Sequence, residues 1–155
     1  MPLTAWRLVK AKHASTAFDG EGARRYGGRW NERGTSVVYL GGSLSLAALE
    51  IFVHLTAEDA QLAFSAIQVD IPDGVSVGTL EPKHLPENWR EEPPPDACKA
   101  LGTAWVKAGE TTLLRVPSVI VPSEYNYLLN PAHRGARRLK IHSPQPFGFD
   151  DRMWK

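Results

Sequence analysis

A carboxylate within an otherwise apolar segment is the first feature of this sequence that could do chemistry. Glu50 lies in the stretch LSLAALEIFVHL, and its neighbours three and four positions away on a helix are Leu46, Ala47, Val53 and His54. A carboxylate in such surroundings is seldom buried without a partner. Two interpretations stay open in equal measure: a structural ion pair with an arginine from elsewhere, or a functional acid.

His54 follows Glu50 by one helical turn, so the two side chains could form part of a metal site. Two protein ligands alone make a weak site, because zinc takes three or four. The sequence adds no second histidine motif, and its one cysteine, Cys98, lies in a stretch typical of an ordinary helix. We therefore expect no metal, and we interpret His54 as a hydrogen-bonded histidine of the core or its rim.

A second candidate site is the segment YGGRWN, from Tyr26 to Asn31. The paired glycines allow unusual backbone angles and close approach of a ligand, and the planar fork of Arg29 suits phosphate or carboxylate. Three further arginines raise the local positive potential: Arg24, Arg25 and Arg33. Gly-Gly-Arg also occurs in many ordinary turns, and the spacing matches neither a Walker loop nor the glycine motif of dinucleotide folds.

Two more stretches offer groups for ligand contact. Tyr39 lies near the end of a predicted strand, where it could contact a ligand or be a core aromatic with its hydroxyl at the edge. The segment 122–131, PSEYNYLLNP, mixes donors, acceptors and aromatic faces, which suits a nucleotide-like ligand. Within it we assign binding roles to Ser123 and Asn126. Ser123 lacks the Gly-x-Ser-x-Gly setting of a nucleophile, and a turn cap is its simpler role.

The bulk composition fits one folded domain of 155 residues, with 43% hydrophobic and 23% charged residues. A net charge of +1 gives no general attraction to nucleic acid or membranes. One basic run is either a solvated face or a surface for RNA or an acidic partner: His133, Arg134, Arg137, Arg138 and Lys140. With one cysteine, no signal-peptide pattern and no apolar run of membrane length, we expect a cytoplasmic protein without an internal disulfide.

The elements that must position these side chains form a mixed pattern. β-branched, aromatic or alternating stretches predict strands at 5–9, 36–40, 62–71, 75–80, 111–116 and 138–142, and 119–121 continues an extended path. Helices are predicted from Ser43 or Ser45 to about Leu55, apolar on nearly every face, and from Asp96 to Lys107. Loops are predicted at 20–34, 81–95 and 122–131. The irregular order predicts an α+β fold: a single domain over residues 1–155, with mostly antiparallel sheets and a buried helix.

Several short motifs, taken in order, resemble a known family. They are Trp6-Arg7, GGRWN at 27–31, VVYL at 37–40, ALEIFVH at 48–54 and VPSEYNYLLNP at 121–131. Each motif alone is weakly specific, but their order and spacing resemble the RES-domain toxins of bacterial RES–Xre type II toxin–antitoxin modules. The resemblance covers nearly the whole chain.

The resemblance implies a fold similar to that of ADP-ribosyltransferases and an enzyme that uses NAD⁺ as substrate, with no separate cofactor. The family's Arg, Glu and Ser fall on Arg29, Glu50 and Ser123, and its tyrosine on Tyr39; Asn31 and Asn126 are further substrate-binding candidates. The expected partner is an Xre-type helix-turn-helix antitoxin that blocks the site, so contact with DNA is indirect. The resemblance is also compatible with a homodimer within that complex.

The chemistry that the resemblance implies is loss of nicotinamide from NAD⁺, after which the ribose carries positive charge. Glu50 would stabilise that charge, Arg29 would hold the diphosphate or ribose, and Tyr39 would stack on nicotinamide. Water, phosphate or a protein side chain could accept the ADP-ribose. Two alternatives are a non-catalytic module that binds RNA or protein through Arg134 to Lys140, and an RNA-cleaving toxin that uses His54 or His133; scattered histidines and low net charge disfavour the second.

Overall fold

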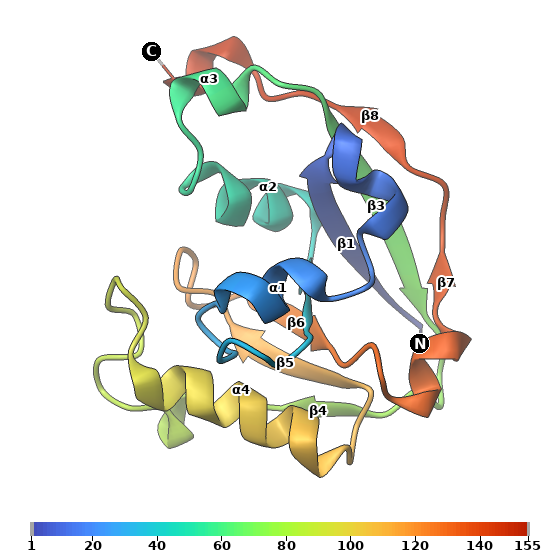
Figure 1. Cartoon of the computed structure of the whole chain (residues 1–155), viewed down its shortest axis with the longest axis vertical. Coiled ribbons are helices and arrows are strands. Elements are labelled where there is room, and N and C mark those ends of the chain that lie inside the picture. The colour runs from blue at the N-terminus through green and yellow to red at the C-terminus, as the bar shows by residue number, and fades with distance from the viewer. Residues whose placement is uncertain (1, 155) are drawn as a thin grey trace.

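The computed structural model describes residues 2–154, and in that part of the chain eight strands form one curled sheet (Figure 1). The strands are β1 (Leu3–Lys10), β2 (Val38–Gly41), β3 (Phe64–Ile71), β4 (Val77–Thr79), β5 (Leu113–Pro117), β6 (Tyr125–Leu129), β7 (Lys140–Ile141) and β8 (Gln145–Phe147). Their order is β4-β5-β6-β2-β1-β3-β7, and β8 also pairs with β3. Only β4 and β5 pair in parallel among these strands, so the predicted α+β fold with mostly antiparallel strands is confirmed.

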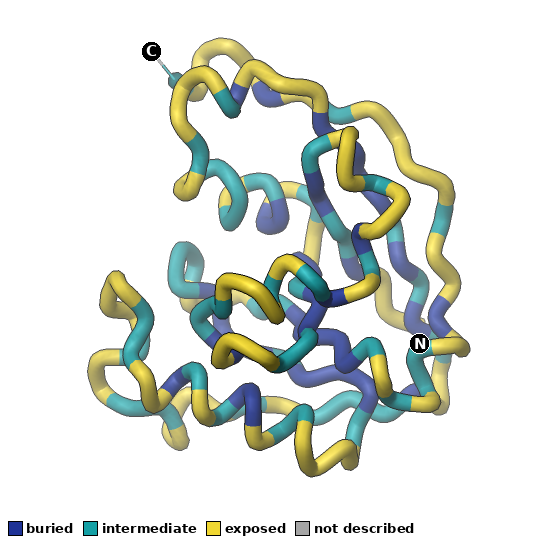
Figure 2. The backbone as a smooth tube through the Cα atoms, viewed as in Figure 1, coloured by how far each residue is buried: buried dark blue, intermediate teal, exposed yellow. Residues whose placement is uncertain are grey.

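Buried apolar clusters lie against both faces of the sheet. β1 and β3 pair along their full length, from Leu3 with Ile71 to Lys10 with Phe64. Figure 2 shows the buried residues concentrated along these strands and along β5 and β6. Leu113 and Leu128 belong to separate clusters on opposite faces of the sheet, and both are fully buried.

Helix α2 (Leu44–Phe52) packs against β1 and β2. Ser43 is its N-cap, because the Ser43 hydroxyl accepts a hydrogen bond from the Leu46 N–H at 3.1 Å. A side chain at Gly41 would lie 2.7 Å from the backbone of Ala47, so glycine allows the helix to sit this close to the sheet. The helix was predicted to be buried because it is apolar on nearly every face, but it is only half-buried. Leu46 and Ala47 are buried, while its other side faces a cavity and solvent.

Two further helices lie next to the glycine-rich segment YGGRWN (residues 26–31). Helix α4 (Asp96–Ala108) ends at Gly109, as predicted, and its Gly102 contacts the carbonyl of Trp30 so closely that a Cβ atom would overlap that oxygen. Helix α1 (Glu21–Tyr26) was predicted as loop, because its sequence EGARRY carries little hydrophobic periodicity. Its start is fixed instead by a local bond from the Glu21 N–H to the Asp19 carboxylate at 2.8 Å.

The segment 118–131 also differs from its prediction. Residues 119–121 are a bend and not extended, and the predicted loop 122–131 contains β6, which lies between β2 and β5 near the sheet centre. The smaller elements are α3 (Ala57–Ala60) and the 3-10 turns Ala11–Thr16, Pro82–His84, Arg134–Arg138 and Asp151–Trp154. None of the helices in residues 2–154 combines the length and apolar character that crossing a bilayer requires.

Candidate active site

A cavity of about 660 Å³ opens between α1, α2 and the segment 92–94, with β1, β2 and the start of β6 forming its floor. This volume lies in the range of small-molecule sites, roughly 300–1,000 Å³. The predicted residues Arg29, Tyr39, Glu50 and Asn126 all line it, as does His54. In the described chain no group of three or more His, Cys, Asp or Glu side chains could hold a metal ion.

Glu50 is held by a serine that the sequence analysis did not select. The hydroxyl of Ser118 donates to Glu50 Oε1 at 2.6 Å. The Ser118 oxygen in turn accepts hydrogen bonds from the N–H groups of Ile120 (3.1 Å) and Val121 (3.0 Å), and Ser118 is only 1% exposed. Because the two backbone donors fix the serine oxygen, its single proton is directed at the carboxylate. Within residues 2–154 the partner of Glu50 is therefore this hydroxyl and not an arginine.

Ser123, to which the family resemblance assigned the site serine, lies elsewhere. It is exposed in the turn before β6 and does not line the cavity. The segment from Pro117 to Val121 turns Ser118 towards α2, whereas Ser123 lies beyond that bend. The structure therefore places Ser118, and not Ser123, in contact with Glu50.

Tyr39 is fixed from behind by the segment that carries Arg29. Its hydroxyl donates to Asn31 Oδ1 at 2.6 Å and accepts from the Trp30 N–H at 3.1 Å. Burial raises the pKa of this phenol well above its usual value, so Tyr39 stays neutral. A Cβ at Gly28 would lie 2.6 Å from the Tyr39 hydroxyl oxygen, which explains one of the paired glycines.

Asn31 does not reach the cavity, contrary to the prediction that it binds substrate. It is fully buried, and its amide nitrogen donates to the carbonyls of Ala23, Glu32 and Thr35. Its place is behind Tyr39, where it orients the phenol. Asn126 does line the cavity, and its Oδ1 is buried without a hydrogen-bond partner among the described residues.

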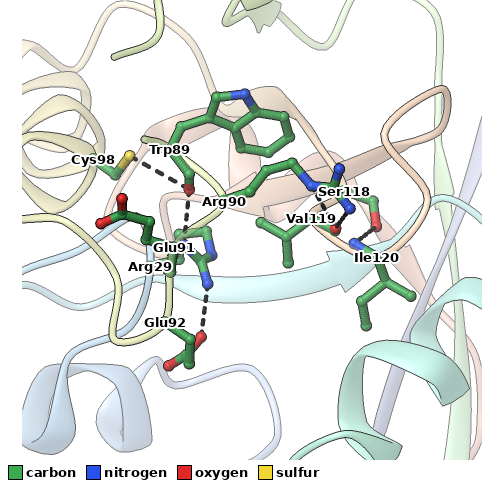
Figure 3. Close-up of polar contacts among 9 residues, drawn as sticks. All are labelled: Arg29, Trp89, Arg90, Glu91, Glu92, Cys98, Ser118, Val119 and Ile120. Carbon is green, nitrogen blue, oxygen red and sulfur yellow. Dashed lines mark hydrogen bonds and ion pairs between the residues drawn. The ribbon is translucent and has the colours of Figure 1, made fainter. Parts of the chain in front are cut away.

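Arg29 is tied to the segment 89–92 (Figure 3). Its Nη1 donates to the carbonyls of Trp89 and Glu91, both at 2.8 Å, and its Nη2 pairs with Glu92 Oε2 at 2.7 Å. The Arg29 side chain is 11% exposed, while that of Glu92 is 65% exposed. Arg90 anchors the same segment from its other side by donating twice to the Val119 carbonyl, at 3.0 and 2.8 Å.

Arg7 is a second guanidinium in the cavity wall that the sequence analysis missed as a site residue. Its Nε donates to the Ala17 carbonyl at 3.0 Å and its Nη1 to the Tyr39 carbonyl at 3.4 Å. Burial lowers the pKa of Arg7 to about 10, against the opposing effect of Asp19, so it remains charged at neutral pH. The sequence signal for Arg7 was its place in the middle of the strand LTAWRLVK, because burying a charge among apolar residues is costly unless the charge is paired.

His133 and the basic run lie apart from this cavity, whereas His54 is exposed at its wall. His133 caps the turn Arg134–Arg138, since its Nδ1 accepts from the Gly135 N–H at 2.9 Å, and it does not line the cavity. Arg138 donates to the Gly74 carbonyl at 3.1 Å. The cavity thus combines the Glu50 carboxylate held by Ser118, the Glu92 carboxylate paired with Arg29, the guanidiniums of Arg7 and Arg29, and aromatic walls. This arrangement suits an anionic ligand with a reacting centre that becomes positive.

Comparison with known proteins first defines the class of fold. The chain superposes on the solved M. tuberculosis MbcT–MbcA toxin–antitoxin complex with a TM-score of 0.77 and 20% identity, covering 96% of this chain and 85% of the matched chain. At this identity the match shows a shared fold. The model of the RES domain then matches residues 4–150, and the chain belongs to the RES-domain family.

Several curated relatives match nearly end to end. A protein named Toxin Res from Yersinia enterocolitica (serotype O:8 / biotype 1B) is 38% identical over 149 residues, which is 96% of this chain and 97% of that protein. A protein named Prs ADP-ribosylating toxin from Sphingobium sp. (strain YBL2) is 38% identical over 157 residues, which is 99% and 98% of the two chains. Another Toxin Res, from Photorhabdus laumondii, is 34% identical over 151 residues, with 97% of this chain and 96% of that protein covered.

Proposed function

We propose that this chain is the toxin of a toxin–antitoxin module and that it consumes NAD⁺ by breaking the bond between nicotinamide and ribose. The toxin names of its relatives and the toxin fold of the MbcT–MbcA complex support the first part. The name of the Sphingobium relative supports the second, since ADP-ribosylation begins by breaking that bond. Depletion of NAD⁺ would arrest growth of the cell.

The observation that carries the proposal is the Ser118–Glu50 hydrogen bond in a cavity that also contains Arg7 and Arg29. As the C1′–N bond breaks, its electron pair goes to the pyridinium nitrogen, and the ribose C1′ becomes positive. A carboxylate fixed beforehand stabilises that charge without having to reorganise. The two guanidiniums favour the diphosphate, whose charge is negative.

The remaining roles follow from the parts of each side chain that are not already engaged in hydrogen bonds. The Tyr39 hydroxyl is already used by Asn31 and Trp30, so the face of its ring is the part available to nicotinamide. Asn126 presents an amide whose oxygen lacks a partner in the described chain, and a hydroxyl or carboxamide of the dinucleotide could supply the donor. Ser118 takes the role of the family serine by orienting Glu50. Catalysis needs no metal, because nicotinamide leaves as a neutral molecule.

The test is nicotinamide release from NAD⁺ by the purified chain, measured with and without inorganic phosphate. Release in buffer alone, with free ADP-ribose as the second product, means that water forms the new bond to C1′ and loses a proton. Release that depends on phosphate means phosphorolysis. Glu50→Gln removes the charge and keeps the shape, so it should abolish turnover without unfolding the protein. Full turnover by Glu50→Gln, or none by the unaltered chain, contradicts the proposal.

A second candidate is transfer of ADP-ribose to a protein, favoured by the name of the Sphingobium relative. Incubation with labelled NAD⁺ and a cell extract would then leave label on a protein, and Glu50→Gln would leave none. A third candidate, the non-catalytic RNA- or protein-binding module, predicts no loss of NAD⁺ and RNA binding that weakens steeply with salt.

The partners belong to the same proposal. A separately encoded Xre-type helix-turn-helix antitoxin would cover the cavity, and the chain would meet DNA only through it. The proposal also includes a cytoplasmic location and a homodimer within the complex. Size measurement of the co-expressed pair, together with loss of NAD⁺ cleavage when the antitoxin is added, tests both the partner and its place of binding.

A further inference from the structure

The Arg29–Glu92 pair places a negative charge where the proposed substrate would lie. Both residues line the cavity, and the Glu92 carboxylate is 65% exposed although one of its oxygens accepts from Arg29 at 2.7 Å. Arg29 is itself held by two backbone carbonyls, which fix the guanidinium and therefore its carboxylate partner. The Glu92 carboxylate is thus held in the cavity wall before any ligand binds.

A carboxylate only accepts hydrogen bonds, which decides what can bind beside it. The hydroxyl groups of a ribose can donate to Glu92 while its bond to Arg29 stays in place. A phosphate at the same position would meet a like charge, or would have to displace Glu92 from Arg29. Carboxylates select ribose hydroxyls over a ribose phosphate in dinucleotide sites by this difference.

The position of Glu92 indicates which end of a dinucleotide it would meet. Figure 3 shows the Arg29–Glu92 pair on the opposite side of Arg90 from Ser118. Ser118 holds Glu50, which in the proposed function faces the nicotinamide ribose. The Glu92 side of the cavity is then left for the adenosine ribose.

We propose that Glu92 is a specificity residue that makes the site select NAD⁺ over NADP⁺ by accepting hydrogen bonds from the adenosine ribose and repelling a 2′-phosphate. This inference rests on the proposed function. In this arrangement Glu92 contacts the adenosine ribose and not the bond that breaks, so its replacement changes the relative kcat/KM for the two dinucleotides.

The experiment compares kcat/KM for nicotinamide release from NAD⁺ and from NADP⁺. Glu92→Gln keeps an oxygen that can accept from Arg29 and removes the charge, so the wall should stay in place. We expect the unaltered chain to prefer NAD⁺, and Glu92→Gln to shift the NADP⁺/NAD⁺ ratio of kcat/KM towards NADP⁺ by about tenfold or more. Glu87→Gln is the matched control, because Glu87 is exposed in the same loop and outside the cavity wall; it should leave the ratio unchanged.

The outcomes separate this inference from the proposed function. Cleavage of NAD⁺ with the same ratio in Glu92→Gln overturns the inference alone. Equal increases in kcat/KM for both dinucleotides also overturn it, because they would mean that Glu92 competes with either substrate for Arg29. If the unaltered chain releases nicotinamide from neither dinucleotide, the proposed function fails and this inference fails with it.

Discussion

The Ser118 hydroxyl donates to Glu50 Oε1 at 2.6 Å and joins the bend after β5 to helix α2 across 68 positions of sequence. Its oxygen is held by two backbone N–H groups, so the carboxylate is bonded to a rigid support. The position of Glu50 therefore depends on a bend whose Pro117 and Val119 also line the cavity.

Replacement of Ser118 by alanine should lower kcat for NAD⁺ cleavage by about 10- to 100-fold, because a misplaced catalytic group loses much of its effect. KM should change little, and Ser118→Thr should restore part of kcat. The control is Ser123→Ala, which removes the exposed serine and should have no effect on either constant. Equal losses in Ser118→Ala and Ser123→Ala would contradict the assignment of Ser118.

Replacement of Arg7 by glutamine should raise KM for NAD⁺ by about tenfold, since one charge facing the diphosphate is lost. Arg7→Lys keeps the charge but cannot reach both the Ala17 and Tyr39 carbonyls, so an intermediate KM is expected. Arg137→Gln is the matched control on the exposed basic run. An unchanged KM in Arg7→Gln rules out a substrate contact, and RNA binding lost in Arg137→Gln supports the module alternative instead.

Tyr39→Phe tests the phenol as a structural group. The change leaves the Asn31 oxygen and the Trp30 N–H without their partner in a buried setting, which costs about 1–3 kcal/mol in the free energy of unfolding. Urea denaturation measures it, and the aromatic face for nicotinamide is kept. A variant of unchanged stability would show that these two bonds are replaceable.

The two glycines Gly102 and Gly22 should respond in opposite directions to alanine. A Cβ at Gly102 would overlap the Trp30 carbonyl oxygen, so Gly102→Ala must push α4 away from the glycine-rich segment and destabilise the protein by about 2–4 kcal/mol. Gly22 lies in α1 with open space where a Cβ would be added, and Gly22→Ala should stabilise by about 0.5–1 kcal/mol. Thermal denaturation of the two variants shows whether each is more or less stable than the unaltered chain.

The Asp70–His142 contact predicts how stability depends on pH at the β3–β7 edge. Hydrogen bonds from His142 and Gln68 lower the pKa of Asp70 below its usual 3.8. A depressed carboxyl pKa adds stability above the unfolded value, and this stability is lost as pH falls through the folded value. Asp70→Asn should therefore lower the melting temperature at neutral pH and flatten its decline in acid. Parallel curves for the two proteins would contradict this.

Local signals were sufficient for elements such as β3 and α4. β3 is a β-branched apolar run closed by Pro72, and α4 ends at a glycine with positive φ. α1 and β6 were missed because their residues are polar or aromatic without a clear period. The start of α1 depends on one aspartate, and β6 becomes a strand through its pairing with β2 and β5.

The site was predictable to the extent that single residues are unusual in their own segments. Glu50 in an apolar helix and Arg29 after two glycines both line the cavity. Ser118 was not recognisable, because its role exists only through contact with a helix residue 68 positions away. Asn31 looked like a binding residue from its motif, and only the three carbonyls around its amide show that it is internal.

The order of the sheet carries a consequence for synthesis. Along the chain β1 precedes β6 and the bend before it, and both are interior strands of the sheet. Arg7, Arg29 and Glu50 are therefore translated before the serine that holds the carboxylate, and the proposed catalytic centre is incomplete until Ser118 has been made. Under the proposed function, NAD⁺ cleavage therefore waits until this bend has folded onto α2, and a protective partner has that interval in which to bind the growing chain.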